Sequence, residues 1–103
     1  MAQAEGYDAS VFYAFFASAG LETIAEDTSN AGRLDLAVRY ADQVFLFEIK
    51  TDAQPSGSAL AQINDRGYAD KYRAEGVPIH LVGVEFSRDQ RTLTRLEVQT
   101  IPA

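Results

Sequence analysis

The stretch that decides the fold runs from Gly32 to Lys50 and reads Gly-Arg-Leu-Asp-Leu-Ala-Val-Arg-Tyr, then Ala-Asp-Gln, then Val-Phe-Leu-Phe-Glu-Ile-Lys. Two apolar runs flank Ala41 and Asp42, and this pattern predicts the two strands of a β-hairpin. Ionisable residues interrupt the runs at three positions, which are Asp35, Glu48 and Lys50. These three residues form the candidate functional site.

Hairpin geometry predicts that the two acids lie opposite each other. If the loop is a tight turn of two residues, Tyr40 pairs with Gln43, and the same register brings Asp35 opposite Glu48. A four-residue loop keeps this register, and Ala41 is an unfavourable residue for a tight primed turn. A loop with an odd number of residues would instead make the two acids diagonal neighbours.

The three ionisable groups are expected on one face of the sheet. Residues two apart on a strand share a face, so Lys50 lies beside Glu48. Like charges that face each other in an antiparallel pair repel. A divalent cation between Asp35 and Glu48 would offset this repulsion, and oxygen-only ligands suit Mg²⁺ or Mn²⁺. A glutamate and a lysine at this spacing also form structural ion pairs or a solvated face, so the spacing leaves both interpretations open.

The surroundings of Glu48 favour the functional interpretation. The run from Val44 to Ile49 is apolar on both faces except at Glu48, which predicts a central strand covered on both sides. An unpaired charge buried there would be unfavourable. Perturbed ionisable groups in partly buried places are functional candidates.

These residues resemble the motif of the PD-(D/E)xK nuclease superfamily, in which an Asp at a strand end precedes a Glu-x-Lys strand. The resemblance covers nearly the whole chain. It includes Glu26, Gly-Arg-Leu-Asp, Phe-Glu-Ile-Lys and the segments 59–72 and 81–87, which are similar to the nuclease-like domain at the C-terminal end of bacterial proteins that begin with an AAA-type ATPase domain. The fold that this implies is a restriction-endonuclease-like α/β sandwich.

The resemblance implies metal-dependent hydrolysis of phosphodiester bonds in nucleic acid, with DNA as the first expectation. Asp35 and Glu48 would hold Mg²⁺ or Mn²⁺ with help from the Ile49 carbonyl. Lys50 would orient the attacking water or stabilise charge in the transition state.

Two further polar residues are candidates by the same resemblance. Gln62 matches the glutamine of the family's helix and would contact the substrate, and an exposed glutamine explains it equally well. Glu26 is either an additional acidic ligand or a charge at the edge of the sheet.

Composition limits the function classes. The 103 residues predict one small domain (1–103), and the absence of cysteine excludes disulfides, zinc-thiolate sites and cysteine nucleophiles. The chain has no glycine-rich phosphate-binding loop, which argues against nucleotide hydrolysis on this chain. It shows no signal peptide and no apolar run long enough to span a membrane, so a cytoplasmic location is expected.

The net charge of −6 counts against nucleic-acid binding by this domain alone, because Lys and Arg normally neutralise the phosphates. The nine basic residues are scattered, with Arg33 and Arg66 expected near the site. The alternative function is a non-catalytic nuclease-like module for recognition, dimerisation or regulation of an ATPase partner. An ATPase domain and a second copy of the chain are therefore both candidate partners.

The predicted element order is αβββαββ, with one mixed sheet flanked by helices. The first helix spans 7–19, is capped by Asp8 or Ser10 and ends at Gly20. A strand at 22–27, a turn cluster at 28–32, the hairpin, and a helix at 58–75 follow. A buried strand at 78–86 is expected parallel to 44–50, since a helix connects them. A half-exposed edge strand at 93–100 ends the domain.

Helical spacing also predicts which side chains enter the core. The first helix carries an apolar stripe at positions 11, 12, 15, 16 and 19. The second helix has a broad apolar side that includes Tyr68 and Tyr72, whereas Gln62, Arg66 and Arg73 share its polar side.

Overall fold

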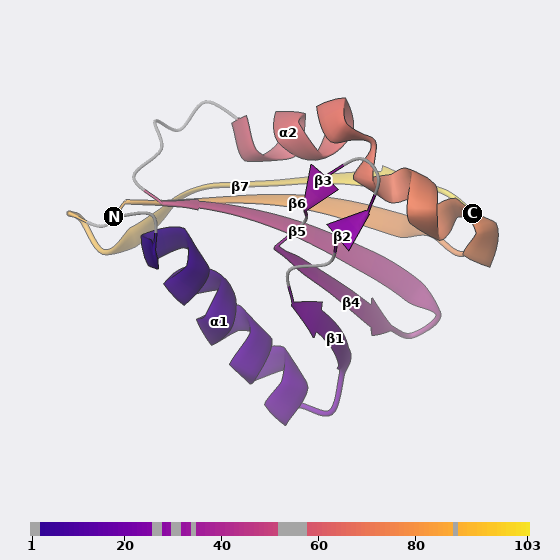
Figure 1. The fold of residues 1–103 in the computed structure, drawn as a ribbon, viewed down its shortest axis with the longest axis horizontal. Helices are drawn as coiled ribbons and strands as arrows, with labels where there is room; N and C mark the ends of the chain where they lie inside the picture. Colours follow the sequence, from indigo (N-terminus) through magenta and orange to yellow (C-terminus); the bar gives the residue numbers. More distant parts are fainter. Residues whose placement is uncertain (1–2, 26–27, 30–31, 34, 52–57, 88) are drawn as a thin grey trace.

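A computed structural model of the chain describes residues 3–25, 28–29, 32–33, 35–51, 58–87 and 89–103. Its main feature is a mixed five-stranded sheet with one helix, α1, on one face and the helices α2 and η1 on the other (Figure 1). This arrangement confirms the predicted α/β sandwich with a mixed sheet flanked by helices.

The elements follow in the order α1 (Gln3–Ser18), β1 (Glu22–Ala25), β2 (Thr28–Ser29), β3 (Gly32–Arg33), β4 (Leu36–Tyr40), β5 (Gln43–Thr51), α2 (Ser58–Arg66), the 3₁₀ helix η1 (Tyr68–Glu75), β6 (Ile79–Ser87) and β7 (Thr92–Ile101). The sheet order is β1-β4-β5-β6-β7, and β2 and β3 form a separate two-stranded ribbon.

The central hairpin has the predicted register. Tyr40 pairs with Gln43 and Leu36 with Phe47 in the antiparallel ladder between β4 and β5. The loop is the two-residue turn, and its residues Ala41 and Asp42 have φ angles of 54° and 58°. Positive φ at both central residues is typical of a type I′ turn. The chain therefore makes the tight turn despite the unfavourable alanine.

The crossover between β5 and β6 is also as predicted. Val44 pairs with Ile79 and Thr51 with Phe86 in a parallel ladder. β7 returns antiparallel to β6, with an irregularity in the ladder at Glu85 and Phe86. Strand β5 is thus paired on both sides and covered by helices on both faces, as the sequence predicts for a central strand.

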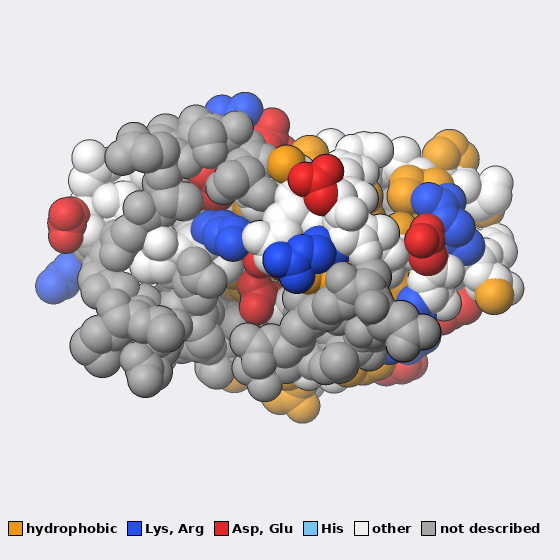
Figure 2. All heavy atoms as spheres, turned by 45° about the horizontal axis from the view of Figure 1, so that its top comes forward, with side chains coloured by type: hydrophobic (Ala, Val, Ile, Leu, Met, Phe, Trp, Pro, Cys, Tyr) orange, Lys and Arg blue, Asp and Glu red, His pale blue; other side chains and the backbone are white. Residues whose placement is uncertain are grey.

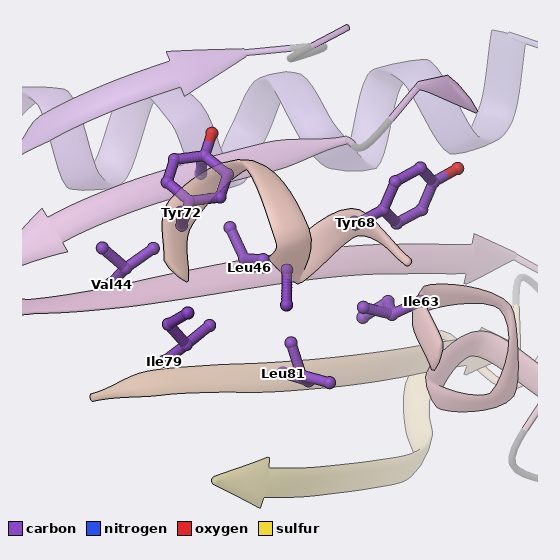
Figure 3. Close-up of a cluster of buried hydrophobic side chains, with 9 residues drawn as sticks. Val44, Leu46, Ile63, Tyr68, Tyr72, Ile79 and Leu81 are labelled. Atoms are coloured by element: carbon purple, nitrogen blue, oxygen red, sulfur yellow. The ribbon is translucent and has the colours of Figure 1, made fainter. Parts of the chain in front are cut away.

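The main core lies between the sheet and the helices α2 and η1. Alternate residues of β5 and β6 point to this face, and Ile63, Tyr68 and Tyr72 cover them from the helices (Figure 3). The strand residues of the cluster are Ala37, Val44, Leu46, Ile79 and Leu81, all almost completely buried. Each fully buried aliphatic side chain contributes about 1.5–3 kcal/mol to folding.

The second core lies under α1, and here the predicted stripe is partly wrong. Phe12 and Phe16 pack on Phe47, with ring centroids 6.4 and 5.4 Å away. Val11 and Phe15, which the helical spacing assigns to the core, are instead 52% and 67% exposed. The described part of the helix is apolar around most of its circumference, so the spacing of its apolar residues does not indicate which side is buried.

Two helix boundaries also differ from the prediction. α1 begins at Gln3, so Asp8 and Ser10 lie within the helix and do not cap it, whereas the helix does end before Gly20. The single helix expected over 58–75 is interrupted at Gly67, which has φ 63° and separates α2 from η1. A left-handed glycine ends an α-helix. The turn cluster at 28–32 contains β2 and the first residue of β3, and the end of the strand expected over 22–27 lies outside the described residues.

Candidate active site

The candidate site is centred on Glu48, which β5 places on the face covered by α2. Glu48 is only 5% exposed, and its neighbours on the strand are apolar. Its Oε2 accepts a hydrogen bond of 3.0 Å from the side-chain amide of Gln62. The Lys50 Nζ lies 3.8 Å from the same oxygen, and the Lys50 side chain is 25% exposed. A buried carboxylate therefore meets an amide and a partly exposed ammonium group.

Asp35 reaches the same strand from the start of β4. Its Oδ2 accepts a hydrogen bond of 2.8 Å from the backbone N–H of Ile49. The ladder begins at Leu36 opposite Phe47, and one more step in this register brings Asp35 opposite Glu48. The carboxyl group of Asp35 is thus held against the backbone next to Glu48.

Gln62 reaches Glu48 because α2 lies very close to the sheet. The strand residue opposite Glu48 on β6 is Gly83, which has no side chain. A Cβ atom at this position would lie 2.5 Å from the backbone nitrogen of Leu60. The glycine therefore allows the first turns of α2 to approach the sheet and brings Gln62, two residues further on, over the site.

Glu85 is a buried acid next to this site and is not among the residues predicted from the sequence. It is 1% exposed, and it pairs in register with Lys50 on β5 and Arg95 on β7. Its Oε2 accepts a long hydrogen bond of 3.4 Å from the backbone N–H of Ala59 in α2. The signal that marks Glu48, an acid within an apolar run, is present at Glu85 as well.

Strand β7, which pairs with β6, carries two further charged residues next to Glu85. Arg95 donates a hydrogen bond of 3.0 Å to Glu97 on the same strand. This bond holds the pKa of the Glu97 carboxyl below its usual value. The same bond, together with the charges of Glu97 and Glu85, raises the pKa of Arg95. Lysine, glutamate and arginine thus alternate across three neighbouring strands.

Three further residues were expected at or near the site, namely Glu26, Arg33 and Arg66. Glu26 lies outside the described residues, as does the side chain of Arg33. Arg66 is exposed in the last turn of α2. Within the described residues, no group of three or more His, Asp or Glu side chains is arranged to hold a metal ion.

The charges at the surface are mixed. Figure 2 shows Lys and Arg side chains interspersed with Asp and Glu on the face turned forward, without an extended basic patch among the described residues. Within the same residues, no helix is long and apolar enough to cross a lipid bilayer.

A buried Glu-x-Lys strand, paired with a strand preceded by Asp and covered by a helix on each face, is the arrangement expected of the PD-(D/E)XK nucleases. The sequence model described as "PD-(D/E)XK nuclease superfamily" matches residues 3–96. The chain therefore belongs to this superfamily, and its mixed sheet with flanking helices is a restriction-endonuclease-like α/β fold.

A curated relative is similar over almost the full chain. It is an uncharacterized protein from the region 5′ of vnfD in Azotobacter chroococcum mcd 1, 51% identical over 102 residues. The match covers 98% of this chain and 20% of the relative. The chain thus spans about a fifth of the length of the curated relative that it matches.

Proposed function

We propose that this domain is a metal-dependent nuclease that hydrolyses phosphodiester bonds in nucleic acid, with DNA as the first substrate to test. The observation that carries the proposal is the burial of Glu48 within 3.8 Å of the Lys50 ammonium and 3.0 Å of the Gln62 amide. Burial of a carboxylate in an apolar strand lowers stability unless other interactions compensate. Such a position is more characteristic of a functional site than of a solvated surface pair.

The donor set fits a hard divalent cation. Asp35 and Glu48 offer carboxylate oxygens from neighbouring strands, and the Ile49 carbonyl offers a third oxygen. Mg²⁺ commonly binds one or two carboxylates together with waters and substrate phosphates, so a cage of three acidic side chains is not required. When bound, Mg²⁺ or Mn²⁺ would polarise the scissile phosphate and lower the pKa of a coordinated water.

The chain's own residues would have separate roles in the reaction. Asp35 would be held in position by its hydrogen bond from Ile49. Lys50, partly exposed beside Glu48, would direct its ammonium group at the phosphate and stabilise the negative charge that develops in the transition state. Gln62 would position Glu48 and contact the substrate backbone at the edge of α2.

The test is cleavage of plasmid and oligonucleotide DNA and of RNA with Mg²⁺ or Mn²⁺. Activity should disappear in Lys50→Ala and Asp35→Asn. Lys71→Ala is the matched control, since it removes a lysine from the exposed side of η1 and should keep the activity. Absence of cleavage with either metal, together with absence of metal binding in calorimetry, would contradict the nuclease proposal.

Thermal unfolding gives an independent measure of metal binding. A ligand that binds only the folded state stabilises it by about 2.7 kcal/mol at 100 times its Kd. Mg²⁺ should therefore raise the Tm of the wild type. Glu48→Gln keeps an oxygen that can accept from Gln62, yet it should abolish this response and raise the Tm measured without metal.

The second candidate is a non-catalytic nuclease-like module that recognises, or regulates, an ATPase domain or partner. The acidic net charge of −6 and the mixed surface charge favour it, because nucleic-acid binding relies on clustered Lys and Arg. The short span of the chain relative to its curated relative leaves room for such a domain in that longer protein. Metal binding without cleavage of any nucleic acid would favour this second function.

A further inference from the structure

Strand β7 lies at the end of the sheet order and, within the described residues, pairs only with β6. It spans ten residues, Thr92–Ile101, and most of them are exposed. The outer side of an edge strand presents backbone N–H and C=O groups that can pair with another chain. A long edge of this kind is a surface suited to β-strand addition.

The face of β7 on the α1 side is apolar and uncovered. Leu93, Leu96 and Val98 are 45%, 56% and 58% exposed and pair in register with Phe86, Val84 and Val82. α1 packs mainly on the other end of the sheet, against β1, β4 and β5. Exposed apolar side chains that are contiguous, rather than scattered, are typical of interaction surfaces.

The charges on the opposite face of β7 determine which partner fits. A two-fold axis perpendicular to the sheet pairs two β7 strands antiparallel and keeps equivalent side chains on the same face. Among such registers, the one centred on Leu96 places Arg95 opposite Glu97 of the partner subunit. A register centred on residue 95 places two arginines opposite each other, and one centred on residue 97 places two glutamates opposite each other. Both arrangements are unfavourable because like charges repel.

We propose that β7 is a homodimerisation edge, in which two copies of this chain pair their β7 strands antiparallel about Leu96. The sheet then runs through both copies. On one face the arginine and glutamate of each copy form two cross-strand ion pairs, and on the other face Leu96 meets Leu96 of the partner subunit, with Val98 beside it. The strand carries one Arg and one Glu and so has no net charge, in a chain of net charge −6. Self-association at this edge therefore avoids much of the repulsion between the two acidic molecules.

The proposed pairing can be tested by substitutions at one exposed position, Leu96. Leu96→Lys and Leu96→Glu each place like charges opposite each other at the two-fold axis, so each variant should dimerise about 100-fold or more weakly than the wild type. An equimolar mixture of the two variants places lysine opposite glutamate and should form a heterodimer. Sedimentation velocity over a concentration series measures the masses, and circular dichroism checks that both variants fold.

The matched control is Tyr40→Lys, which introduces the same charge at a side chain with 58% exposure on β4, away from β7. It should dimerise like the wild type. A second pair of variants, Arg95→Glu and Glu97→Arg, should be monomeric separately and dimeric when mixed. Recovery in the mixture cannot come from the ion pair within one strand, because neither variant contains both charges.

Three results would overturn the proposal. The first is a wild type that stays monomeric up to concentrations of about 1 mM, the range in which even weak specific pairs associate. The second is a wild-type dimer that the Leu96 variants leave intact, since the contact would then lie elsewhere. The third is a failure of the folded Leu96→Lys and Leu96→Glu variants to pair with each other.

Discussion

Replacing Gly83 by alanine tests how closely α2 lies on the sheet. The added Cβ would be 2.5 Å from the backbone nitrogen of Leu60 and 3.0 Å from its Cα. Both atoms belong to the backbone of a helix, so no side-chain rotation relieves the contact. The helix has to move away from the sheet, and Gln62 has to move away from Glu48 with it.

Two opposing effects decide the sign of the stability change. Gly83 is not among the glycines with positive φ, so its strand conformation is also accessible to alanine. Without the clash, alanine would stabilise the protein by about 0.4–1 kcal/mol, because it lowers the conformational entropy of the unfolded chain. Overpacking of a tight interior costs about 1–3 kcal/mol. Because the clash involves main-chain atoms, we expect the upper part of this range and a net loss of about 1–2 kcal/mol. For a domain of this size each kcal/mol lowers the Tm by about 4–8 °C.

Urea denaturation gives the free energy of unfolding, and amide hydrogen exchange locates the change. Gly83→Ala should accelerate exchange in α2 more than elsewhere. Gly76→Ala is the matched control, because a Cβ at that position meets nothing within 4 Å and its cost of about 1 kcal/mol comes from the positive φ of 67°. If Gly83→Ala is as stable as the wild type, the inference that the backbone of α2 lies in close contact with β6 is wrong.

Substitutions at four further positions test other parts of the structure. Ala41→Gly should raise the free energy of unfolding by about 1 kcal/mol, because Ala41 has a φ of 54° in the tight turn; an unchanged urea midpoint would contradict that turn. Leu46→Ala should lower it by about 2–5 kcal/mol, since Leu46 is fully buried; a loss below about 1 kcal/mol in the same assay would mean a loosely packed core. Hydrogen bonds from Arg39 lower the pKa of the Glu75 carboxyl in the folded protein. The stabilisation that this carboxylate gives the folded state is complete above its unfolded pKa of 4.5 and is lost as the pH falls through the lower folded pKa. Glu75→Gln should therefore reduce the loss of stability on acidification, and an acid transition identical to that of the wild type would argue against this ion pair. Glu85→Ala should cost about 1–3 kcal/mol by removing a buried hydrogen-bond acceptor, and Glu85→Gln should recover part of this in thermal unfolding; equal losses would mean that the acceptor oxygen is unimportant.

The hairpin at the centre of the fold could be predicted because local rules fix it. A turn of even length determines the pairing of every residue in β4 and β5, and side chains alternate between faces, so the position of Asp35 relative to Glu48 followed from numbering alone. The parallel pairing of β5 and β6 followed from the long connection between them.

Features that depend on tertiary packing could not be predicted in this way. The described part of α1 is rich in apolar residues on several sides, and the sheet selects Phe12 and Phe16 over Phe15. The role of Gly83 is visible only when α2 is placed above it. Glu85 carries the same sequence signal as Glu48, but its strand lies beyond the helix, so no short-range rule connects it to Lys50.

The parallel pairing of β5 and β6 has a consequence for the order in which the site is assembled. Asp35 and Glu48 belong to one hairpin and need only a local turn to meet. Gln62 and Glu85 join them only after the intervening helix has formed and β6 has docked, a contact that is distant in sequence and slow to close. During synthesis, the two acids of the motif would therefore come together in solvent before the helix that buries them arrives.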